Sequence, residues 1–122
     1  MTLKAELRRL GRAFRYAGRG VAYVWRTQSN ARWHGLATVV VIIAAYGLRV
    51  RGAEAAALAL AVGLVWAMEA LNTAVEALAD RCTRERDPLI AAAKDAAAGA
   101  VLLAALAAVV VAALIFIPRL GR

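Results

Sequence analysis

Residue types that often form metal-binding or catalytic sites in water-soluble proteins are scarce in this chain. Its 122 residues include one cysteine, Cys82, one histidine and two lysines. A single cysteine excludes an intrachain disulfide, and with no histidine near it in the sequence Cys82 predicts neither a zinc site nor a catalytic triad. The GxxxxGK[ST] phosphate-binding motif and the protein-kinase signatures are also absent. Any nucleotide must therefore be bound by a different arrangement of residues.

Acidic residues are few, whereas apolar residues are abundant. The chain has 8 Asp and Glu against 16 Lys and Arg, a formal net charge of +8, and 63% of its residues are hydrophobic. So much apolar surface exceeds what one small water-soluble core can bury, and the composition predicts an all-α membrane protein. Basic chains also bind nucleic acid. Membrane topology and anionic lipid account for the excess charge in this chain, so we expect no nucleic-acid partner.

Three apolar runs, at residues 35–48, 55–68 and 96–117, predict the membrane spans. A helix needs about 20 residues to cross a hydrocarbon core of roughly 30 Å, so the shorter runs must include flanking residues. We expect one domain over residues 1–122, with a surface helix at 1–30 and transmembrane helices at about 33–48, 53–80 and 90–117. The tight turn at 49–52 makes the first two spans antiparallel, and Pro88 places the start of the third.

An amphipathic helix precedes the first span. Apolar residues recur at alternating spacings of four and three from Leu3 to Val24, and most arginines lie on the other faces. This pattern favours a helix in the membrane interface with its apolar side in lipid, and a cytoplasmic coiled coil is the alternative. Gly18 and Gly20 weaken the helix and predict a break in it.

The placement of positive charge predicts the topology. Eight Lys and Arg residues precede the first span and three lie between the second and third, whereas the turn at 49–53 has two. The positive-inside rule then places the N-terminus and the 81–90 connection in the cytoplasm, and the C-terminus outside. Trp33 and His34, at the start of the first span, suit an anchoring role at the interface.

Four polar residues follow the second apolar run: Glu69, Asn72, Glu76 and Asp80. Their spacings of three, four and four place the side chains in one narrow stripe of a helix. An ionisable group inside a span is costly, so the stripe indicates a wet or catalytic face, with hydrogen bonding between packed helices as the alternative. Asp80 lies about 16 Å along the helix from Glu69. Glu69 is therefore expected at the headgroup boundary and Asp80 in the cytoplasm.

A second pair of charged residues, Lys94 and Asp95, stands at the cytoplasmic start of the third predicted span. The lysine can hold a phosphate, and the aspartate can accept a hydrogen bond from a ribose or an adenine amine. Alternatively, Lys94 only extends its ammonium group to the membrane surface. Small residues in the third span, Gly99 among them, predict close helix packing and more than one subunit.

The segments from Glu69 to Asp80, EALNTAVEALAD, and from Ala93 to Leu103, AKDAAAGAVLL, resemble the signature of the prokaryotic diacylglycerol kinase family, which includes the undecaprenol kinases. The resemblance covers nearly the whole chain. It implies a homotrimer of three-span subunits in the bacterial plasma membrane that uses Mg²⁺ and transfers the γ-phosphate of ATP to a lipid hydroxyl. The acceptor would be diacylglycerol or undecaprenol, and the pattern at residues 30–34 is more similar to the undecaprenol branch.

The same resemblance implies roles for individual residues. It makes Glu69 the general base and Glu76 a magnesium ligand, with Gln28 where some members have a second metal-binding glutamate. An amide oxygen can coordinate magnesium but adds no negative charge, so we expect Gln28 to be the weaker ligand. The residues expected to bind ATP are Arg9, Tyr16, Gln28, Glu76, Asp80, Glu85, Arg86, Asp87, Lys94 and Asp95. Those expected to line the rest of the site are Trp25, Arg32, Glu69, Asn72 and Gly99.

Two other classes of function remain open at this point. A small oligomeric transporter could use Glu69 and Glu76 as a proton or cation relay. A membrane scaffold could use the same stripe only to fix its assembly. A phosphorylated lipid product would distinguish a kinase from both, since phosphoryl transfer needs a metal, a proton acceptor and positioned reactants.

Overall fold

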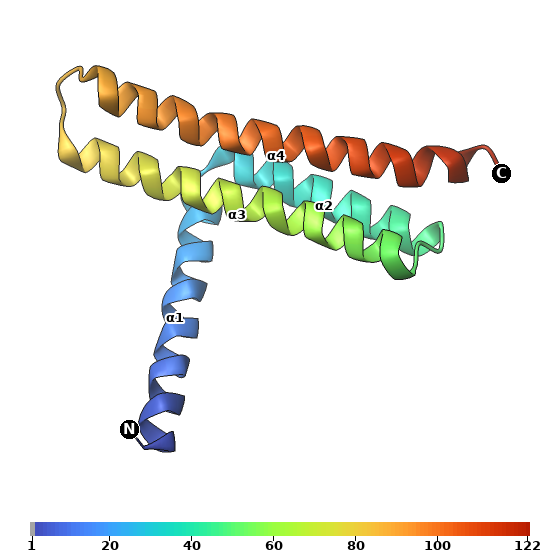
Figure 1. The fold of residues 1–122 in the computed structure, drawn as a ribbon, viewed down its shortest axis with the longest axis horizontal. Helices are drawn as coiled ribbons and strands as arrows, with labels where there is room; N and C mark the ends of the chain where they lie inside the picture. Colours follow the sequence, from blue (N-terminus) through green and yellow to red (C-terminus); the bar gives the residue numbers. More distant parts are fainter. Residues whose placement is uncertain (1) are drawn as a thin grey trace.

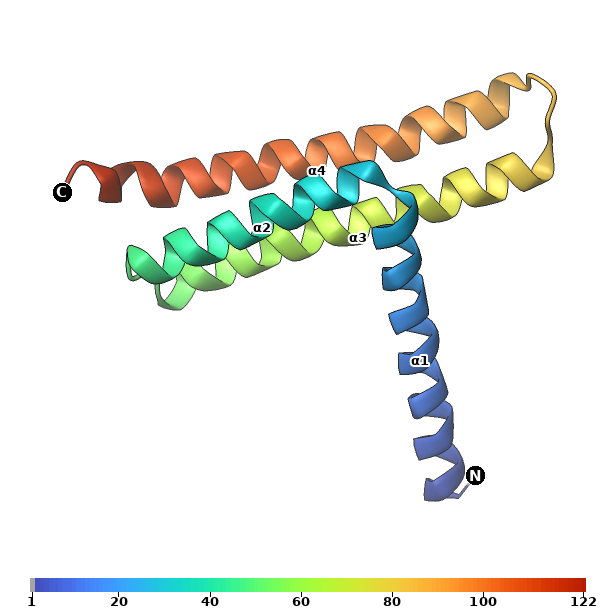
Figure 2. The ribbon, with the colours of Figure 1, turned by 180° about the vertical axis from the view of Figure 1, so that it is seen from behind.

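Helices make up nearly all of the chain that the structure describes. The computed structural model describes residues 2–122. Over that range it has four helices and no strand, with α1 at Leu3–Thr27, α2 at Ser29–Gly47, α3 at Gly52–Cys82 and α4 at Pro88–Leu120. The helices α2, α3 and α4 lie side by side, while α1 projects away from them (Figures 1 and 2). The predicted all-α class is confirmed.

The first helix, α1, is continuous, and the break predicted at Gly18 and Gly20 is not found. The two glycines lower helix propensity by about 1 kcal/mol each, which weakens a helix without ending it. The helix ends instead before Gln28, which has an extended backbone with φ −107° and ψ 115° and also caps the start of α2. The expected boundaries at residues 30 and 33 are therefore corrected to a single junction at Gln28.

The turn between α2 and α3 ends the first of these helices with paired hydrogen bonds. The Val50 amide donates to the Ala45 carbonyl at 2.9 Å. The Arg49 amide donates to the Tyr46 carbonyl at 3.3 Å, which completes a Schellman motif. Arg49 has a φ of 56°, the left-handed conformation that this motif usually gives to glycine. The chain reverses here, so α2 and α3 are antiparallel neighbours as predicted (Figure 1).

The last helix begins with a cap and ends with an ion pair. The Asp87 carboxylate accepts hydrogen bonds from the amides of Leu89 and Ile90, at 2.8 and 3.2 Å. Pro88 occupies the first turn of α4, where its missing N–H costs no hydrogen bond within the helix. The predicted start of this helix is confirmed. α4 then returns alongside α3 (Figure 2). In its last turn, Arg119 pairs with Glu54 in the first turn of α3.

Large apolar side chains cover the outside of the helices. Examples are Ile43, Leu60 and Leu103, which are 66%, 74% and 70% exposed. Among the described residues, α3 and α4 are the two helices long and apolar enough to cross a membrane. α2 is not among them, because its first two turns contain polar residues such as Arg32 and His34. These features favour a membrane protein, and the third span stays a prediction.

An aromatic cluster attaches α1 to the bundle. The ring of Trp25 stacks on that of Trp66 in α3, with centroids 6.2 Å apart and an interplanar angle of 28°. Trp66 Nε1 donates to Thr38 Oγ1 at 3.0 Å, and Thr38 Oγ1 donates to the His34 carbonyl at 2.7 Å. Gly35 lies directly against the Trp25 ring, since a Cβ added there would come within 2.7 Å of Cζ3. The cluster fixes where α1 leaves α2 and α3.

Substituting Gly35 should test this cluster. We expect Gly35→Ala to displace the Trp25 ring and to lower the free energy of unfolding by about 1–3 kcal/mol, the usual cost of overpacking. Thermal unfolding in detergent, followed by tryptophan fluorescence, measures the loss. Gly18→Ala in α1 is the matched control, because a Cβ there meets nothing within 4 Å. Equal midpoints for the two variants would contradict the close contact.

Candidate active site

The side chains of the polar stripe on α3 are buried at one end and exposed to solvent at the other. Glu69 is 1% exposed and Asn72 is 9% exposed. One turn further Glu76 is half-buried, and the Asp80 side chain is 70% exposed. Exposure thus rises along the stripe from Glu69 to Asp80, and the membrane depth expected for the two residues stays a prediction.

The carboxylate of Glu69 is buried without a hydrogen bond. Both of its oxygens lack a hydrogen-bond partner within the described chain, and so does Oδ1 of Asn72 one turn away. The nearest ionisable group is His34 on α2, whose Nε2 lies 3.7 Å from Glu69 Oε2. Thr73 donates to the Glu69 backbone carbonyl at 2.8 Å and leaves the carboxylate free. Three acceptor atoms thus remain available to donors or cations that a ligand would bring.

Gln28 and Glu76 come together although they lie far apart in the sequence. Gln28 Nε2 donates to Glu76 Oε2 at 3.3 Å, from the junction of α1 and α2 to the middle of the stripe. The pair supplies one carboxylate and one amide oxygen, and both are ligand types that Mg²⁺ accepts. Across residues 2–122 no group of three or more His, Cys, Asp or Glu side chains could hold a metal ion. A cation bound here would therefore take further oxygens from water or from a phosphorylated ligand.

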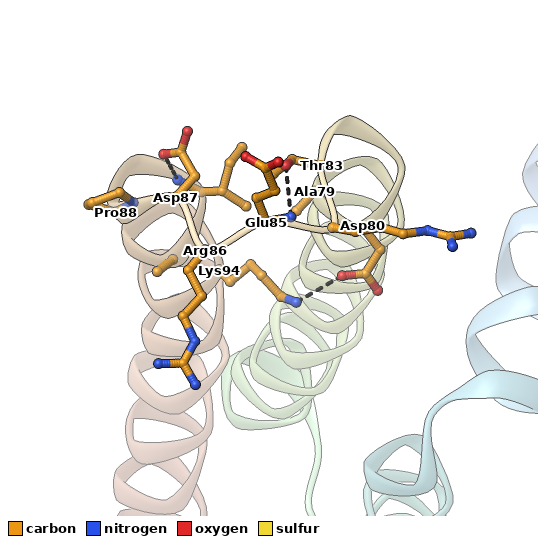
Figure 3. Close-up of a pocket in the computed structure, with 11 residues that line it drawn as sticks. Ala79, Asp80, Thr83, Glu85, Arg86, Asp87, Pro88 and Lys94 are labelled. Carbon is orange, nitrogen blue, oxygen red and sulfur yellow. Dashed lines mark hydrogen bonds and ion pairs between the residues drawn. The ribbon is translucent and has the colours of Figure 1, made fainter.

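A cavity of about 810 Å³ opens at the solvent end of the stripe. It is enclosed by the last turn of α3, the loop at 83–87 and the first turns of α4 (Figure 3). Lys94 reaches across from α4 and donates to Asp80 Oδ1 at 2.9 Å. This bond joins the charged start of α4 to the solvent-exposed end of the stripe on α3. The predicted loop residues Glu85, Arg86 and Asp87 also line it. The volume lies within the range that small-molecule sites usually have.

Loop structure keeps the charged groups at the rim. The Glu85 amide donates to Thr83 Oγ1 at 3.0 Å, a short turn that ends α3. Asp87 is occupied in capping α4. Arg84 lines the cavity beside Arg86 and Lys94. The same cavity is lined by the carboxylates of Asp80, Glu85 and Asp87, so it offers groups of both signs to a ligand. Arg84 was not among the residues that the sequence indicated.

Other expected site residues lie further from this cavity. Arg9 and Tyr16 are exposed on the part of α1 that projects from the bundle (Figure 1), and their roles stay predictions. Arg32 and Asp95 are also exposed. Gly99 is half-buried, and a Cβ there would meet nothing within 4 Å, so the close packing expected at Gly99 is not made within this chain.

Sequence reasoning missed three contributors to the site. His34 was expected only as an interfacial anchor, yet its imidazole faces Glu69. Trp66 stacks with Trp25, and Thr73 bonds the Glu69 backbone. No local pattern could reveal the first contact, because it joins residues 35 positions apart on different helices. The single histidine of the chain was the one available signal.

Comparison with known proteins identifies relatives over most of the chain. The family model for prokaryotic diacylglycerol kinase matches residues 15–116. An undecaprenol kinase of Bacillus subtilis (strain 168) is 38% identical over 115 residues, which are 94% of this chain and 94% of that protein. A diacylglycerol kinase of Synechocystis sp. is 46% identical over 88 residues, which are 71% of this chain and 50% of that protein. The matched residues include the whole polar stripe and the charged loop.

Burial of Glu69 predicts a stability effect. We expect Glu69→Gln to raise the midpoint of thermal unfolding, since the amide no longer places a desolvated charge beside apolar side chains, a gain on the order of 1 kcal/mol or more. Calorimetry of the detergent-solubilised protein without added ligand measures it. Glu6→Gln, at an exposed position on α1, is the control and should change nothing. A lower midpoint for Glu69→Gln would show that the carboxylate has a stabilising partner.

Proposed function

Because the chain belongs to the prokaryotic diacylglycerol kinase family, we propose that it transfers the γ-phosphate of ATP to the hydroxyl of a membrane lipid alcohol. The chain is a lipid kinase by its family and its relatives. ATP as the donor, Mg²⁺ as the cofactor and the choice of alcohol belong to the proposal. The observation that supports it most is the buried Glu69 carboxylate, which has no hydrogen-bond partner in the described chain, on the same stripe as a solvent-open cavity lined by charged side chains.

The cavity between Asp80 and Lys94 is suited to the nucleotide. Its basic side chains can bind phosphates, and its carboxylates can accept hydrogen bonds from a ribose or an adenine amine. From there the phosphates would extend along α3 toward Glu76, because the stripe is the polar path that leads from the cavity into the helices. Gln28 and Glu76 would hold Mg²⁺. When bound, Mg²⁺ neutralises charge on the phosphates.

Glu69 is placed to receive a proton from the lipid. In the reaction the alcohol oxygen bonds to the γ-phosphorus, the bond from that phosphorus to the ADP oxygen breaks, and the hydroxyl proton passes to the carboxylate. Burial of Glu69 keeps bulk water away from this step. The unpaired Oδ1 of Asn72 can accept a second hydrogen bond beside it.

We further propose that three chains, each with α2, α3 and α4 across the membrane, form the working enzyme in a bacterial plasma membrane. The basic α1 and the 83–87 loop would face the cytoplasm, where ATP is available. The exposed apolar side chains of α2, α3 and α4 support this arrangement, since lipid or neighbouring copies must cover them. The Arg9 and Tyr16 positions on α1 would then be free to approach nucleotide from a neighbouring subunit.

Undecaprenol is the acceptor that the comparisons support first. The relative named undecaprenol kinase matches over 94% of both chains, and so includes α1, whereas the diacylglycerol kinase is matched over 50% of its length. A proton or cation relay through Glu69 and Glu76 is the second candidate, and it gives no role to the charged cavity.

A kinase assay tests the proposal directly. Purified protein in lipid vesicles is supplied with Mg²⁺, γ-labelled ATP and either undecaprenol or diacylglycerol, and labelled lipid is separated and counted. We expect the undecaprenol product to form faster. Glu69→Gln should reduce turnover by about 100-fold or more, the usual contribution of a general base, while ATP affinity changes little. Absence of any labelled lipid from the unmodified protein would refute the kinase, and normal turnover by Glu69→Gln would remove Glu69 from the mechanism.

Glu76 and Gln28 differ in charge, so their substitution should lower turnover to different extents. Glu76→Gln should abolish turnover, whereas Gln28→Ala should lower it by about tenfold and raise the Mg²⁺ concentration required, because the amide adds no charge to the site. Gln28→Glu, which supplies a second carboxylate, should lower that concentration. The Mg²⁺ dependence of turnover and the binding of Mn²⁺, followed by electron paramagnetic resonance, measure these effects. Complete loss of Mn²⁺ binding in Gln28→Ala would show that the two ligands are equivalent.

A further inference from the structure

A second charged cavity lies on the surface of α1, the helix that projects from the bundle (Figure 1). It has a volume of about 380 Å³ and is lined by Arg8, Gly11, Arg12 and Arg15. All four residues are exposed, and no other helix within residues 2–122 contributes to its walls. The cavity is an open notch in the surface of one helix, and we call it the arginine notch.

Gly11 forms the floor of the arginine notch. A Cβ added at this position would meet nothing within 4 Å, so the side chains of Arg8 and Arg15 stand back from the glycine backbone. On a helix, the residues three and four positions away are the surface neighbours of a given residue. Arg8 precedes Gly11 by three residues and Arg15 follows it by four, so both arginines flank the glycine on the same side.

The other two surface neighbours of Gly11 are apolar. Leu7 precedes it by four residues and Phe14 follows it by three. At about 100° per residue, both lie on the opposite side of the glycine from the two arginines. Their side chains are 58% and 71% exposed. The arginine notch therefore lies on the border between the apolar and basic faces of an amphipathic helix. A phospholipid has a matching arrangement, because its phosphate lies between its apolar chains and water.

The three guanidinium groups of the notch have no acidic partner in the described chain. Among residues 2–122, no carboxylate lies within 4.0 Å of Arg8, Arg12 or Arg15. The one acidic residue of α1 is Glu6, which lies on another face of the helix. Like charges three and four positions apart repel one another, so an anion in the notch would relieve that repulsion. Guanidinium groups bind phosphate oxygens through several N–H donors at once.

We propose that the arginine notch is a binding site for the phosphate group of an anionic membrane lipid. The guanidinium groups hold the phosphate, and the lipid chains follow the apolar face past Leu7 and Phe14. A bound lipid also fixes the rotation of α1 about its own axis, because the notch then faces the headgroup layer. The site is separate from the nucleotide-binding residues proposed on α1, since Arg9 and Tyr16 do not line it. The proposal goes beyond lipid phosphorylation and does not depend on it.

Binding of phosphatidic acid to the full chain tests the site. The purified protein in neutral detergent is titrated with this lipid, without ATP or a lipid alcohol, and native mass spectrometry counts the molecules bound per chain. Arg12→Gln should weaken binding of the first lipid molecule by about fivefold, the usual effect of one basic residue near an anionic headgroup. Arg26→Gln is the matched control, because it removes the same charge from the last turn of α1. Its affinity should equal that of the unmodified protein.

Filling the notch tests its shape without changing any charge. A leucine at Gly11 occupies the space expected for the phosphate, so Gly11→Leu should weaken binding at least as much as Arg12→Gln. Gly18→Leu is the matched control, because Gly18 also lies on α1 with nothing within 4 Å of an added Cβ, and it does not line the notch. Leucine favours a helix more than glycine does, so both variants should fold. Equal affinities of the two leucine variants, or of Arg12→Gln and Arg26→Gln, would overturn the proposal.

Two further ligands decide whether the site takes a lipid phosphate. Inorganic phosphate at millimolar concentration should not displace phosphatidic acid, because it makes no use of the apolar border. Displacement would instead show a site for soluble phosphate. Phosphatidylcholine has no net charge, and its affinity should be the same for the unmodified protein and for Arg12→Gln. A fivefold loss for this lipid as well would show that Arg12 acts without recognising an anion.

Arginine labelling extends the test to unmutated protein in a bilayer. Phenylglyoxal modifies guanidinium groups, and mass spectrometry reports the rate at each arginine. The protein is compared in vesicles of phosphatidylcholine with and without phosphatidic acid. We expect phosphatidic acid to slow the labelling of Arg8, Arg12 and Arg15 relative to that of Arg26. Equal slowing at all four arginines would indicate a diffuse effect of surface charge and would overturn a site at the notch.

Discussion

Keeping a carboxylate in a dry helix bundle is the constraint on which the rest of this structure depends. Glu69 is nearly fully buried in a protein whose other buried side chains are mostly apolar. Such burial costs several kcal/mol unless a partner or a ligand compensates. The nearest ionisable group is His34 of α2, at 3.7 Å and without a hydrogen bond, and α2 is held in place by its turn with α3 and by the aromatic cluster. Much of the fold around the stripe can be understood as support for one side chain.

The two ends of the stripe on α3 lie in different surroundings. At the Asp80 end α3 is exposed to solvent, beside a cavity lined by acidic and basic side chains. At the Glu69 end it is surrounded by apolar residues. Between them Glu76 meets Gln28, at the junction where the basic α1 gives way to α2. In the proposed reaction, the phosphate donor would approach from the solvent-exposed end of this stripe and the lipid alcohol from its buried end.

Local features of this chain were predictable, and contacts between helices were less so. The spacing of Glu69, Asn72, Glu76 and Asp80 fixed the stripe, because side chains three and four apart share a helix face. Pro88 likewise placed the start of α4. The junction at Gln28 was missed because glycine lowers helix propensity without marking where a helix ends. The Gln28–Glu76 and His34–Glu69 contacts join distant residues, and no periodicity within one helix contains that information. The family signature supplied roles for residues but not these contacts.

The ion pair between Glu54 and Arg119 has a mechanical consequence. It joins the first turn of α3 to the last turn of α4, while the short loop at 83–87 joins the same two helices at the other end. Links at both ends disfavour sliding of one helix past the other, although a partly exposed ion pair contributes only about 1 kcal/mol or less. The remaining helices, α2 and α1, join this hairpin through the turn containing Arg49 and the junction at Gln28.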